Sequence, residues 1–288
     1  MKLQNFLNQV IPLINRVTGE SEEIIKNRLC KELQRTGSNV TEVFYENGLI
    51  PYVMNKNQEI IYKSDAFIYE LLVYNISEVK SKIQNHLLNF LKDKNNLKIL
   101  MYGDGIGLDS LLLIKNGYDI TYYDYEGKTY EFAKKIWQHF EVSPKVCFAP
   151  TTLELKYDII VAFDVLEHVE NPEETIKEFN RILNPNGFVI LTAPFDALSY
   201  YLPTHLYSNY ENFHGRLSTF FKKENMYLNE NTMDNLLVYI FQKNVKKKSK
   251  QVYKLLFKEI LKRIKKRFFK IKLSNSKQTI SPILNIFN

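Results

Sequence analysis

The sequence has few cysteines and no long apolar run. Cys30 and Cys147 stand far apart and fit neither a disulfide framework nor a metal-ligand spacing, which favours a reducing compartment. No apolar run approaches the ~18 residues that a membrane span needs. Amides interrupt the first ten residues, where a signal peptide has an unbroken apolar core. We therefore expect a cytoplasmic protein, with a peripheral position at the membrane as the alternative.

Acidic residues are almost absent from one segment near the C-terminus. Between Lys243 and Lys272 the chain has fourteen Lys or Arg residues and one acid, Glu259, so this segment carries +13. The whole chain of 288 residues carries a formal net charge of +7, so the remainder carries −6. Its length allows one large α/β domain with an appendage, or two small domains. The basic charge therefore belongs to a tail, and the body is mildly acidic.

The stretch from Leu97 to Asp124 is typical of the first half of a nucleotide-binding βαβ unit. An apolar strand leads into the turn Gly103-x-Gly105-x-Gly107, and an amphipathic helix and a second strand follow. Glycines let the backbone take left-handed angles and approach a polar ligand closely. Asp124 stands 17 residues after the last glycine, close to the spacing at which an acid binds ribose hydroxyls. This stretch predicts a site for an adenosine-type cofactor.

Strands and helices alternate along the middle of the chain. This alternation predicts an α/β fold with a doubly wound, mostly parallel, Rossmann-like sheet. The region 1–95 reads as a mainly helical cap over the site or a dimer surface, with one short strand at 59–62. The core of the fold is expected at 96–244, where a last apolar strand covers 236–241 and a helix covers about 209–222. Residues 245–288 form the basic amphipathic tail.

The order of motifs resembles the class I S-adenosylmethionine-dependent methyltransferases, particularly the branch with ubiquinone-biosynthesis and small-molecule methylases. The resemblance covers residues 97 to about 243, roughly half of the chain. The glycine turn is similar to the family's first motif, and Asp124 matches the ribose-binding acid. The stretch Asp164-Val165-Leu166-Glu167-His168 is very close to the branch's sequence after the fourth strand, and Leu183-Asn184-Pro185-Asn186-Gly187 is similar to the link into the fifth strand.

The resemblance implies S-adenosylmethionine as cofactor and S-adenosylhomocysteine as product. The implied cofactor-binding residues come from the turn and from the ends of the strands. They are Tyr102, Gly103, Asp104, Gly105, Gly107, Asp124, Tyr125, Thr151 and Asp164.

The chain departs from the family at two positions. Met101 stands where the family has an acid that helps to hold the methionine part, and Asp104 is the candidate to replace that charge. After the third strand the family often has an acid for the adenine amino group, whereas here Thr151 and its neighbour offer only hydroxyls. We expect the identity of the cofactor to be retained and its contacts to differ.

Three histidines are candidates for the catalytic base. Methyl transfer is an in-line displacement at the sulfonium carbon, so the protein positions the nucleophile and removes a proton when the acceptor is a hydroxyl. His168 follows the fourth strand, while His205 and His214 lie in the segment after the fifth strand. Each of them also has a reading as a packing or loop-stabilising residue. No metal is predicted, because the acids near the histidines lack a dedicated ligand spacing.

The segment after the fifth strand is rich in tyrosine. A wall of Tyr200, Tyr201, Tyr207 and Tyr210 suits a ring-shaped acceptor, since aromatic faces stack on aromatic and sugar rings, and it equally suits a hydrophobic lid. The leading hypothesis is methyl transfer to a hydroxyl oxygen of a small molecule, either a secondary metabolite or a sugar or glycan precursor. The alternatives are N- or C-methylation of a peptide or quinone, and a non-catalytic adaptor that keeps the fold.

The basic tail carries apolar residues on one helical face. These are Tyr253, Phe257, Ile260, Ile264, Phe268 and Ile271. A basic amphipathic helix is typical of a membrane-surface contact, here through 245–272, and the alternative is a helix whose apolar stripe packs on the body. The acidic body and the lack of a recognition module argue against nucleic acid as partner. A homodimer through the helical cap remains open.

Overall fold

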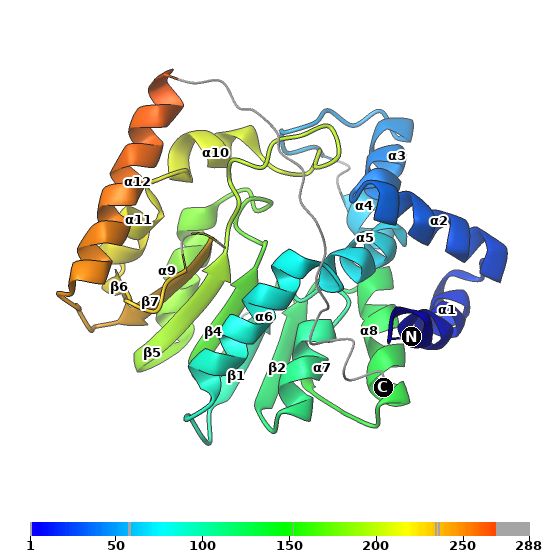
Figure 1. The fold of residues 1–288 in the computed structure, drawn as a ribbon, viewed down its shortest axis with the longest axis horizontal. Coiled ribbons are helices and arrows are strands. Elements are labelled where there is room, and N and C mark those ends of the chain that lie inside the picture. The colour runs from blue at the N-terminus through cyan, green and yellow to red at the C-terminus, as the bar shows by residue number, and fades with distance from the viewer. Residues whose placement is uncertain (1, 57–58, 152, 234, 236, 269–288) are drawn as a thin grey trace.

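The computed structural model describes residues 2–56, 59–151, 153–233, 235 and 237–268, and its central feature is a seven-stranded sheet (Figure 1). The strand order is β3-β2-β1-β4-β5-β7-β6. The strands are β1 (Lys98–Tyr102), β2 (Asp119–Asp124), β3 (Lys145–Phe148), β4 (Tyr157–Phe163), β5 (Leu183–Thr192), β6 (Met226–Leu228) and β7 (Val238–Lys243).

The helices cover both faces of the sheet and one of its edges (Figure 1). They are α1 (Lys2–Thr18), α2 (Glu22–Gln34), α3 (Ser38–Glu46), α4 (Glu59–Lys63), α5 (Ala66–Asn75), α6 (Glu78–Leu91), α7 (Leu108–Lys115), α8 (Lys128–His139), α9 (Pro172–Ile182), α10 (Tyr207–Phe213), α11 (Leu217–Lys223) and α12 (Lys250–Phe268). Several begin at the residues that the sequence indicates. The side chains of Ser21, Ser77 and Asn171 accept backbone N–H bonds at the starts of α2, α6 and α9.

The sheet confirms the predicted doubly wound α/β fold. β1 pairs in parallel with β2 and with β4, and β4 pairs in parallel with β5, whereas β7 runs antiparallel between β5 and β6. The chain winds from β1 toward β3 on one side and from β4 toward β5 on the other. In open sheets of this kind the ligand site lies at the carboxyl ends of the strands, where the winding reverses. That point is here the pair β1 and β4.

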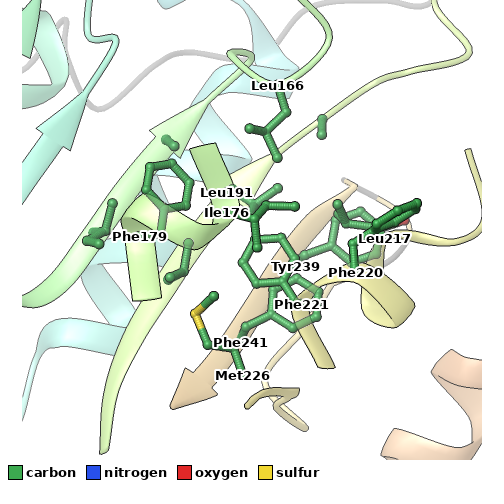
Figure 2. Packing of buried hydrophobic residues seen from close by; sticks show 14 of the residues in the cluster. Leu166, Ile176, Phe179, Leu191, Leu217, Phe220, Phe221, Met226, Tyr239 and Phe241 are labelled. Carbon is green, nitrogen blue, oxygen red and sulfur yellow. The ribbon is translucent and has the colours of Figure 1, made fainter. Parts of the chain in front are cut away.

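Alternate residues of the central strands enter two different hydrophobic clusters. Ile99 and Met101 of β1 pack with α6, and Leu100 between them packs on the opposite face with α9. Figure 2 shows the second face, where side chains of α9 and α11 meet those of β5 and β7. The rings of Phe221 and Phe241 stack there with centroids 3.9 Å apart. Both faces are therefore buried, which is why the strands are apolar without alternation.

The N-terminal helices pack on one end of the sheet. Residues of α1, α2 and α5 share one hydrophobic cluster with α7 and α8, and Tyr122 of β2 belongs to the same cluster. α6 covers β1 and β4 instead. The helical part of the cap prediction is confirmed, while the boundaries at residues 95 and 244 stay a prediction.

Two local predictions were wrong, and one strand was missed. Residues 59–62 are helical in α4 and form no strand. The segment 184–187 lies inside β5, which begins directly after α9 and bulges there against β4, with φ +64° at Asn186. The helix expected at about 209–222 is two helices, α10 and α11, with Gly215 between them at φ +68°. β6 was missed, and it pairs with β7, whose predicted start, Leu236, lies outside the described residues.

The basic tail begins as the predicted helix. α12 runs from Lys250 to Phe268 along the edge of the molecule beyond β6 and β7 (Figure 1). Ile271, the last residue of the predicted apolar face, lies outside the described residues. Among the helices of the described ranges, none has the length and apolar content for crossing a bilayer.

Candidate functional site

The glycine turn connects β1 to α7 in the way that its spacing predicts. All three glycines have left-handed φ angles, +74° at Gly103, +55° at Gly105 and +69° at Gly107. The space beside Gly105 is limited as well, because a Cβ atom there would lie 2.6 Å from Cδ1 of Leu71 in α5. Any residue with a side chain would strain the backbone and collide with the cap. The turn therefore needs glycine for its left-handed conformation and for the close packing of Leu71 on Gly105.

Asp124 ties the end of β2 to the turn. Its Oδ2 accepts a hydrogen bond from the backbone N–H of Gly105 at 2.6 Å, and its Oδ1 accepts one from the N–H of Tyr125 at 2.7 Å. The side chain is half-buried, and burial raises its pKa from 3.8 to about 6 although both N–H bonds favour the charged form. Each carboxylate oxygen keeps a second lone pair for a ligand hydroxyl. The predicted pairing of turn and acid is thus present.

Asp104 has a structural task at the start of α7. Its Oδ2 accepts hydrogen bonds from the N–H and the hydroxyl of Ser110, at 2.8 and 2.5 Å. Burial and the neighbouring Asp109 raise its pKa to about 8. Asp109 is itself held by a buried ion pair with Lys80 of α6, at 2.6 Å. The carboxylate that was expected to replace the missing acid at Met101 is engaged in holding the helix.

Three other predicted cofactor residues lie at strand ends. The ring of Tyr102 packs on Tyr123 and Phe179, with centroids 4.8 and 5.0 Å apart. Tyr125 is exposed beside Asp124, and Thr151 is exposed in the loop after β3. The contact of these three residues with a cofactor stays a prediction.

Asp164 follows β4 in a strained conformation. It has φ +55°, which costs a non-glycine residue about 1–2 kcal/mol. Thr192 at the end of β5 stabilises it, since the Thr192 hydroxyl donates to Asp164 Oδ1 at 2.7 Å and accepts the Asp164 N–H at 3.0 Å. Strain that is maintained by specific bonds is common at functional sites. Asp164 thereby points the loop that follows it, including Glu167 and His168, over the strand ends.

Two residues of α5 face this loop and were missed in the sequence. The hydroxyl of Tyr74 hydrogen-bonds Asp164, and burial together with the Asp164 charge raises the pKa of Tyr74. Burial, with Glu32 and Asp164 nearby, raises the pKa of Glu70 to about 8. Glu70 and Tyr74 are four residues apart and share one face of the helix. That spacing was a detectable signal, but nothing in the sequence shows which face of the cap meets the sheet.

Glu167, His168 and His205 form a compact trio, in which Glu167 and His205 are buried and His168 is half-buried. One ligand atom from each residue lies within 4.8 Å of the others, and the two imidazole rings meet edge to face with centroids 4.6 Å apart. Glu167 is 1% exposed and His205 is 4% exposed. Neither carboxylate oxygen of Glu167 has a hydrogen-bond partner in another described residue, and the same holds for Nδ1 of His205. Unpartnered buried polar atoms are rare and indicate a missing partner.

Burial sets the charge of the trio. It lowers the pKa of His168 to about 4 and that of His205 well below its ordinary value of 6.5, with His168 contributing to the second shift. It raises the pKa of Glu167 well above 4.5, with Asp164 adding to the effect. Both imidazoles are therefore neutral near pH 7 and have a lone pair available. The trio has the chemistry of a proton acceptor, and it also has the nitrogen and oxygen donors of a divalent cation site.

His214 does not belong to the trio. His214 ends α10, with Nδ1 3.9 Å from Oδ1 of Asp196 and its ring 5.3 Å from that of Tyr210. His168 and His205 are brought together although 36 residues lie between them in the sequence. This distance in sequence explains why no ligand spacing was visible. Only the fold of the segment after β5 brings His205 next to His168.

The four tyrosines after β5 do not form one wall. Tyr200 stacks on Tyr45 of α3 with centroids 4.9 Å apart, and the Tyr201 hydroxyl accepts a hydrogen bond from Arg35 at 3.0 Å. Tyr207 is exposed and Tyr210 is buried in α10. The first pair therefore attaches the segment to the helical cap. The cap and this segment together cover the carboxyl ends of the strands.

Comparison with known proteins gives one family and several relatives. The methyltransferase domain family matches residues 76–233. A ubiquinone biosynthesis O-methyltransferase of Rickettsia typhi is 29% identical over 123 residues, which is 41% of this chain and 48% of the relative. One of Rickettsia canadensis is 31% identical over 117 residues, 39% of this chain and 47% of the relative. The matched part of the chain spans about half the length of these curated relatives.

Solved structures with a similar fold have low sequence identity. An S-adenosylmethionine-dependent methyltransferase from Clostridium acetobutylicum is 11% identical with a TM-score of 0.49, and the match covers 64% of this chain and 99% of that one. The N-methyltransferase NodS of Bradyrhizobium japonicum, in complex with S-adenosyl-L-homocysteine, is 14% identical with a TM-score of 0.44. That match covers 59% of this chain and 89% of NodS.

Proposed function

The chain belongs to the class I S-adenosylmethionine-dependent methyltransferases, and from this premise we propose that it transfers the methyl group to a hydroxyl oxygen of a small molecule. The two Rickettsia relatives are O-methyltransferases, which supports oxygen as the acceptor atom. We propose that the acceptor is a secondary metabolite or a sugar or glycan precursor, as the sequence indicates. The observation that carries the choice of oxygen is the contact between the neutral imidazoles of His168 and His205, which lie in the segments after β4 and β5.

The described residues fit the cofactor. Asp124 accepts backbone N–H bonds with one lone pair of each oxygen and keeps the other for two ribose hydroxyls. The left-handed turn at Gly103–Gly107 presents backbone and the start of α7 to the methionine part. Tyr125 after β2 and Thr151 after β3 are the residues that we place beside the adenine. When bound, S-adenosylmethionine supplies a methyl group on a sulfonium, which needs no further activation by the protein.

The trio supplies the step that oxygen needs. A hydroxyl is a weak nucleophile until its proton leaves, whereas an amine reacts from its neutral form. Burial keeps His168 and His205 uncharged, each with a lone pair on a ring nitrogen, and because burial also makes them weak bases, their protonation depends on a negative charge nearby. Asp164 and Tyr74 position the loop that carries His168. The charge of Asp164 raises the pKa of His168 and thereby stabilises the imidazolium that forms.

The donor set of the trio also suits a divalent cation. Two imidazoles and one carboxylate with unpartnered atoms match the ligands that bind zinc and related metals. A cation held by these residues would lower the pKa of a bound hydroxyl and so take the place of a base. The trio is thus the deprotonation site in either form, and removal of divalent cations distinguishes the two.

The experiment uses cell extract as the source of acceptors. Purified protein is incubated with extract and methyl-labelled S-adenosylmethionine, and labelled products are identified by mass spectrometry. We expect a product with a new methoxy group. His168→Ala and His205→Ala should lower its rate about 100-fold or more, the usual contribution of a general base, while cofactor binding stays unchanged. His214→Ala is the matched control and should keep the rate.

Two results would contradict the proposal. A product methylated on nitrogen or carbon, formed equally fast by the histidine variants, indicates the other acceptor chemistry. Calorimetry that detects no binding of S-adenosylmethionine at millimolar concentration removes the catalytic function and leaves the adaptor. The two measurements are independent, so each part of the proposal fails separately.

A further inference from the structure

The helix α12 packs on the protein through a narrow stripe. Val252 and Leu255 are each 5% exposed, and Leu255 belongs to the hydrophobic cluster between β5, β7 and α11. Glu259, the only acid of the helix, is 3% exposed. Its carboxylate accepts hydrogen bonds from the N–H of Ser218 at 3.2 Å and from the Ser218 hydroxyl. The acid of the helix is therefore turned inward and satisfied.

A second apolar stripe of α12 points away from the protein. Its members are large and well exposed, Tyr253 (60%), Phe257 (58%), Ile260 (44%), Leu261 (39%) and Ile264 (48%). Their spacing of three, four or seven residues places them on one side of the helix, roughly opposite the buried stripe. The residues of this stripe between Tyr253 and Ile264 therefore do not pack on the body, although the helix itself does so through Val252 and Leu255. We call these five residues the outward stripe.

Basic residues border the outward stripe. At 100° per residue, Lys250, Lys254 and Lys265 fall along one flank of it, and all three are exposed. Three more exposed lysines, 246–248, directly precede the helix, of which Lys247 lies 3.7 Å from Glu230. The helix has no acid on this side, because Glu259 faces Ser218. Apolar rings and branched chains with a basic border match the boundary between acyl chains and anionic headgroups.

We propose that the outward stripe of α12 binds the surface of an anionic lipid bilayer, with the helix lying in the membrane plane. The charge of the rest of the chain supports a single orientation, since it amounts to −6 and is repelled by anionic lipid. α12 stands at the outer edge of the fold, so the bilayer reaches it without touching the sheet, and its C-terminal end lies near the level of α10 (Figure 1). This inference concerns location and does not rest on the proposed methyl transfer.

Flotation of the full chain with lipid vesicles tests the proposal. We expect binding to vesicles of phosphatidylcholine with phosphatidylglycerol, none to phosphatidylcholine alone, and weaker binding as salt rises. Phe257→Glu with Ile264→Glu should reduce the partition coefficient at least tenfold. Lys254→Glu with Lys265→Glu should reduce it about 30-fold or more, since each basic residue near an anionic surface contributes about 1 kcal/mol.

The controls separate lipid from other occupants of the stripe. Ile24→Glu with Leu33→Glu changes two equally exposed residues of α2 and should leave flotation unchanged. Circular dichroism and melting temperature confirm that each variant is folded. Absence of flotation of the unchanged protein at low salt overturns the proposal. So does full binding by the stripe variant, which places the contact elsewhere in the chain. A stripe variant that converts a dimer into a monomer without altering flotation assigns the stripe to a second copy, and this result also overturns the proposal.

Discussion

Replacing Asp124 by asparagine isolates the charge at the end of β2 while keeping the shape of the side chain. In the proposed complex the carboxylate accepts both ribose hydroxyls in addition to the N–H groups of Gly105 and Tyr125. Hydrogen bonds to a charged group contribute about 1.5–3 kcal/mol, whereas an amide oxygen accepts fewer and weaker bonds. We expect S-adenosylmethionine to bind Asp124→Asn roughly 10- to 150-fold more weakly at pH 8.

The raised pKa of Asp124 adds a pH dependence with a definite sign. The group binds hydroxyls best when it is ionised, and its pKa in the free protein is about 6. Affinity should therefore be constant above about pH 7 and fall about tenfold between pH 7 and pH 5, because a proton must leave before the cofactor binds. The asparagine variant cannot titrate at this position. Its affinity should lack this decline.

The same substitution should stabilise the protein without cofactor. A carboxyl group whose pKa is higher in the folded state stabilises the fold below its unfolded pKa of 3.8, and this contribution is lost as pH rises through about 6. Two pKa units correspond to about 3 kcal/mol, and solvent screening of the half-buried group and loss of one N–H bond leave about 1 kcal/mol. At pH 8 we expect the variant to melt about 2–4 °C higher.

Isothermal titration calorimetry from pH 5 to pH 8 and thermal melts without cofactor measure these effects. Asp119→Asn at the exposed start of β2 is the matched control, because it removes an equal charge far from the turn. Equal affinity of Asp124→Asn and the unchanged protein would refute the role of this acid. A decline below pH 7 that persists in the variant would assign the titration to another group.

The remaining predictions concern the turn, the ion pair below it and the trio. Gly105→Ala should weaken cofactor binding and lower the free energy of unfolding by at least the 1–2 kcal/mol that a left-handed alanine costs. Adding Leu71→Ala should recover only the part of this loss that comes from the 2.6 Å collision. Calorimetry measures the binding of the single and double variants, and thermal melts measure their stability. Lys80→Met breaks a buried ion pair and should lower the free energy of unfolding by about 3–5 kcal/mol, which lowers the melting temperature by roughly 10 °C. As a control in the same melts, Lys82→Met breaks an exposed ion pair and should cost under about 1 kcal/mol. If a cation occupies the trio, dialysis against a chelator should abolish methyl transfer and leave the affinity for S-adenosylmethionine unchanged. Added Zn²⁺, Mn²⁺ or Mg²⁺ should then restore methyl transfer. Full activity after chelation would assign the removal of the proton to histidine alone.

Much of the cofactor half of the site could be read from local sequence. The turn, its helix and Asp124 lie within 28 consecutive residues, from 97 to 124, and short-range geometry determines their arrangement. Positive φ at all three glycines and the Gly105 to Asp124 hydrogen bond confirm the predicted arrangement of turn and acid. Glu59 to Tyr62 was misread because a four-residue apolar pattern fits a strand and a helix equally well. In the structure this segment is the helix α4, and it packs on α8, which is distant in sequence.

The acceptor half depends on contacts between distant segments. His168, His205 and His214 are all candidate bases in sequence, and only the path of the chain after β5 brings His205 beside His168 and leaves His214 at the end of α10. Tyr74 and Glu70 enter the site because α5 packs across the strand ends. Their altered pKa values follow from burial, which a sequence does not display.

The sequence by itself determined the family, the parallel sheet, the cofactor turn and the presence of a basic C-terminal helix, because each follows from local periodicity or from a short motif. Only the tertiary structure decided which face of that helix is buried. The sequence shows an apolar face of α12 without showing whether it meets the body or solvent, and packing of Leu255 and Glu259 against the body leaves Phe257 and Ile264 outside. The same holds for the trio, since burial and the meeting of distant loops depend on the whole fold.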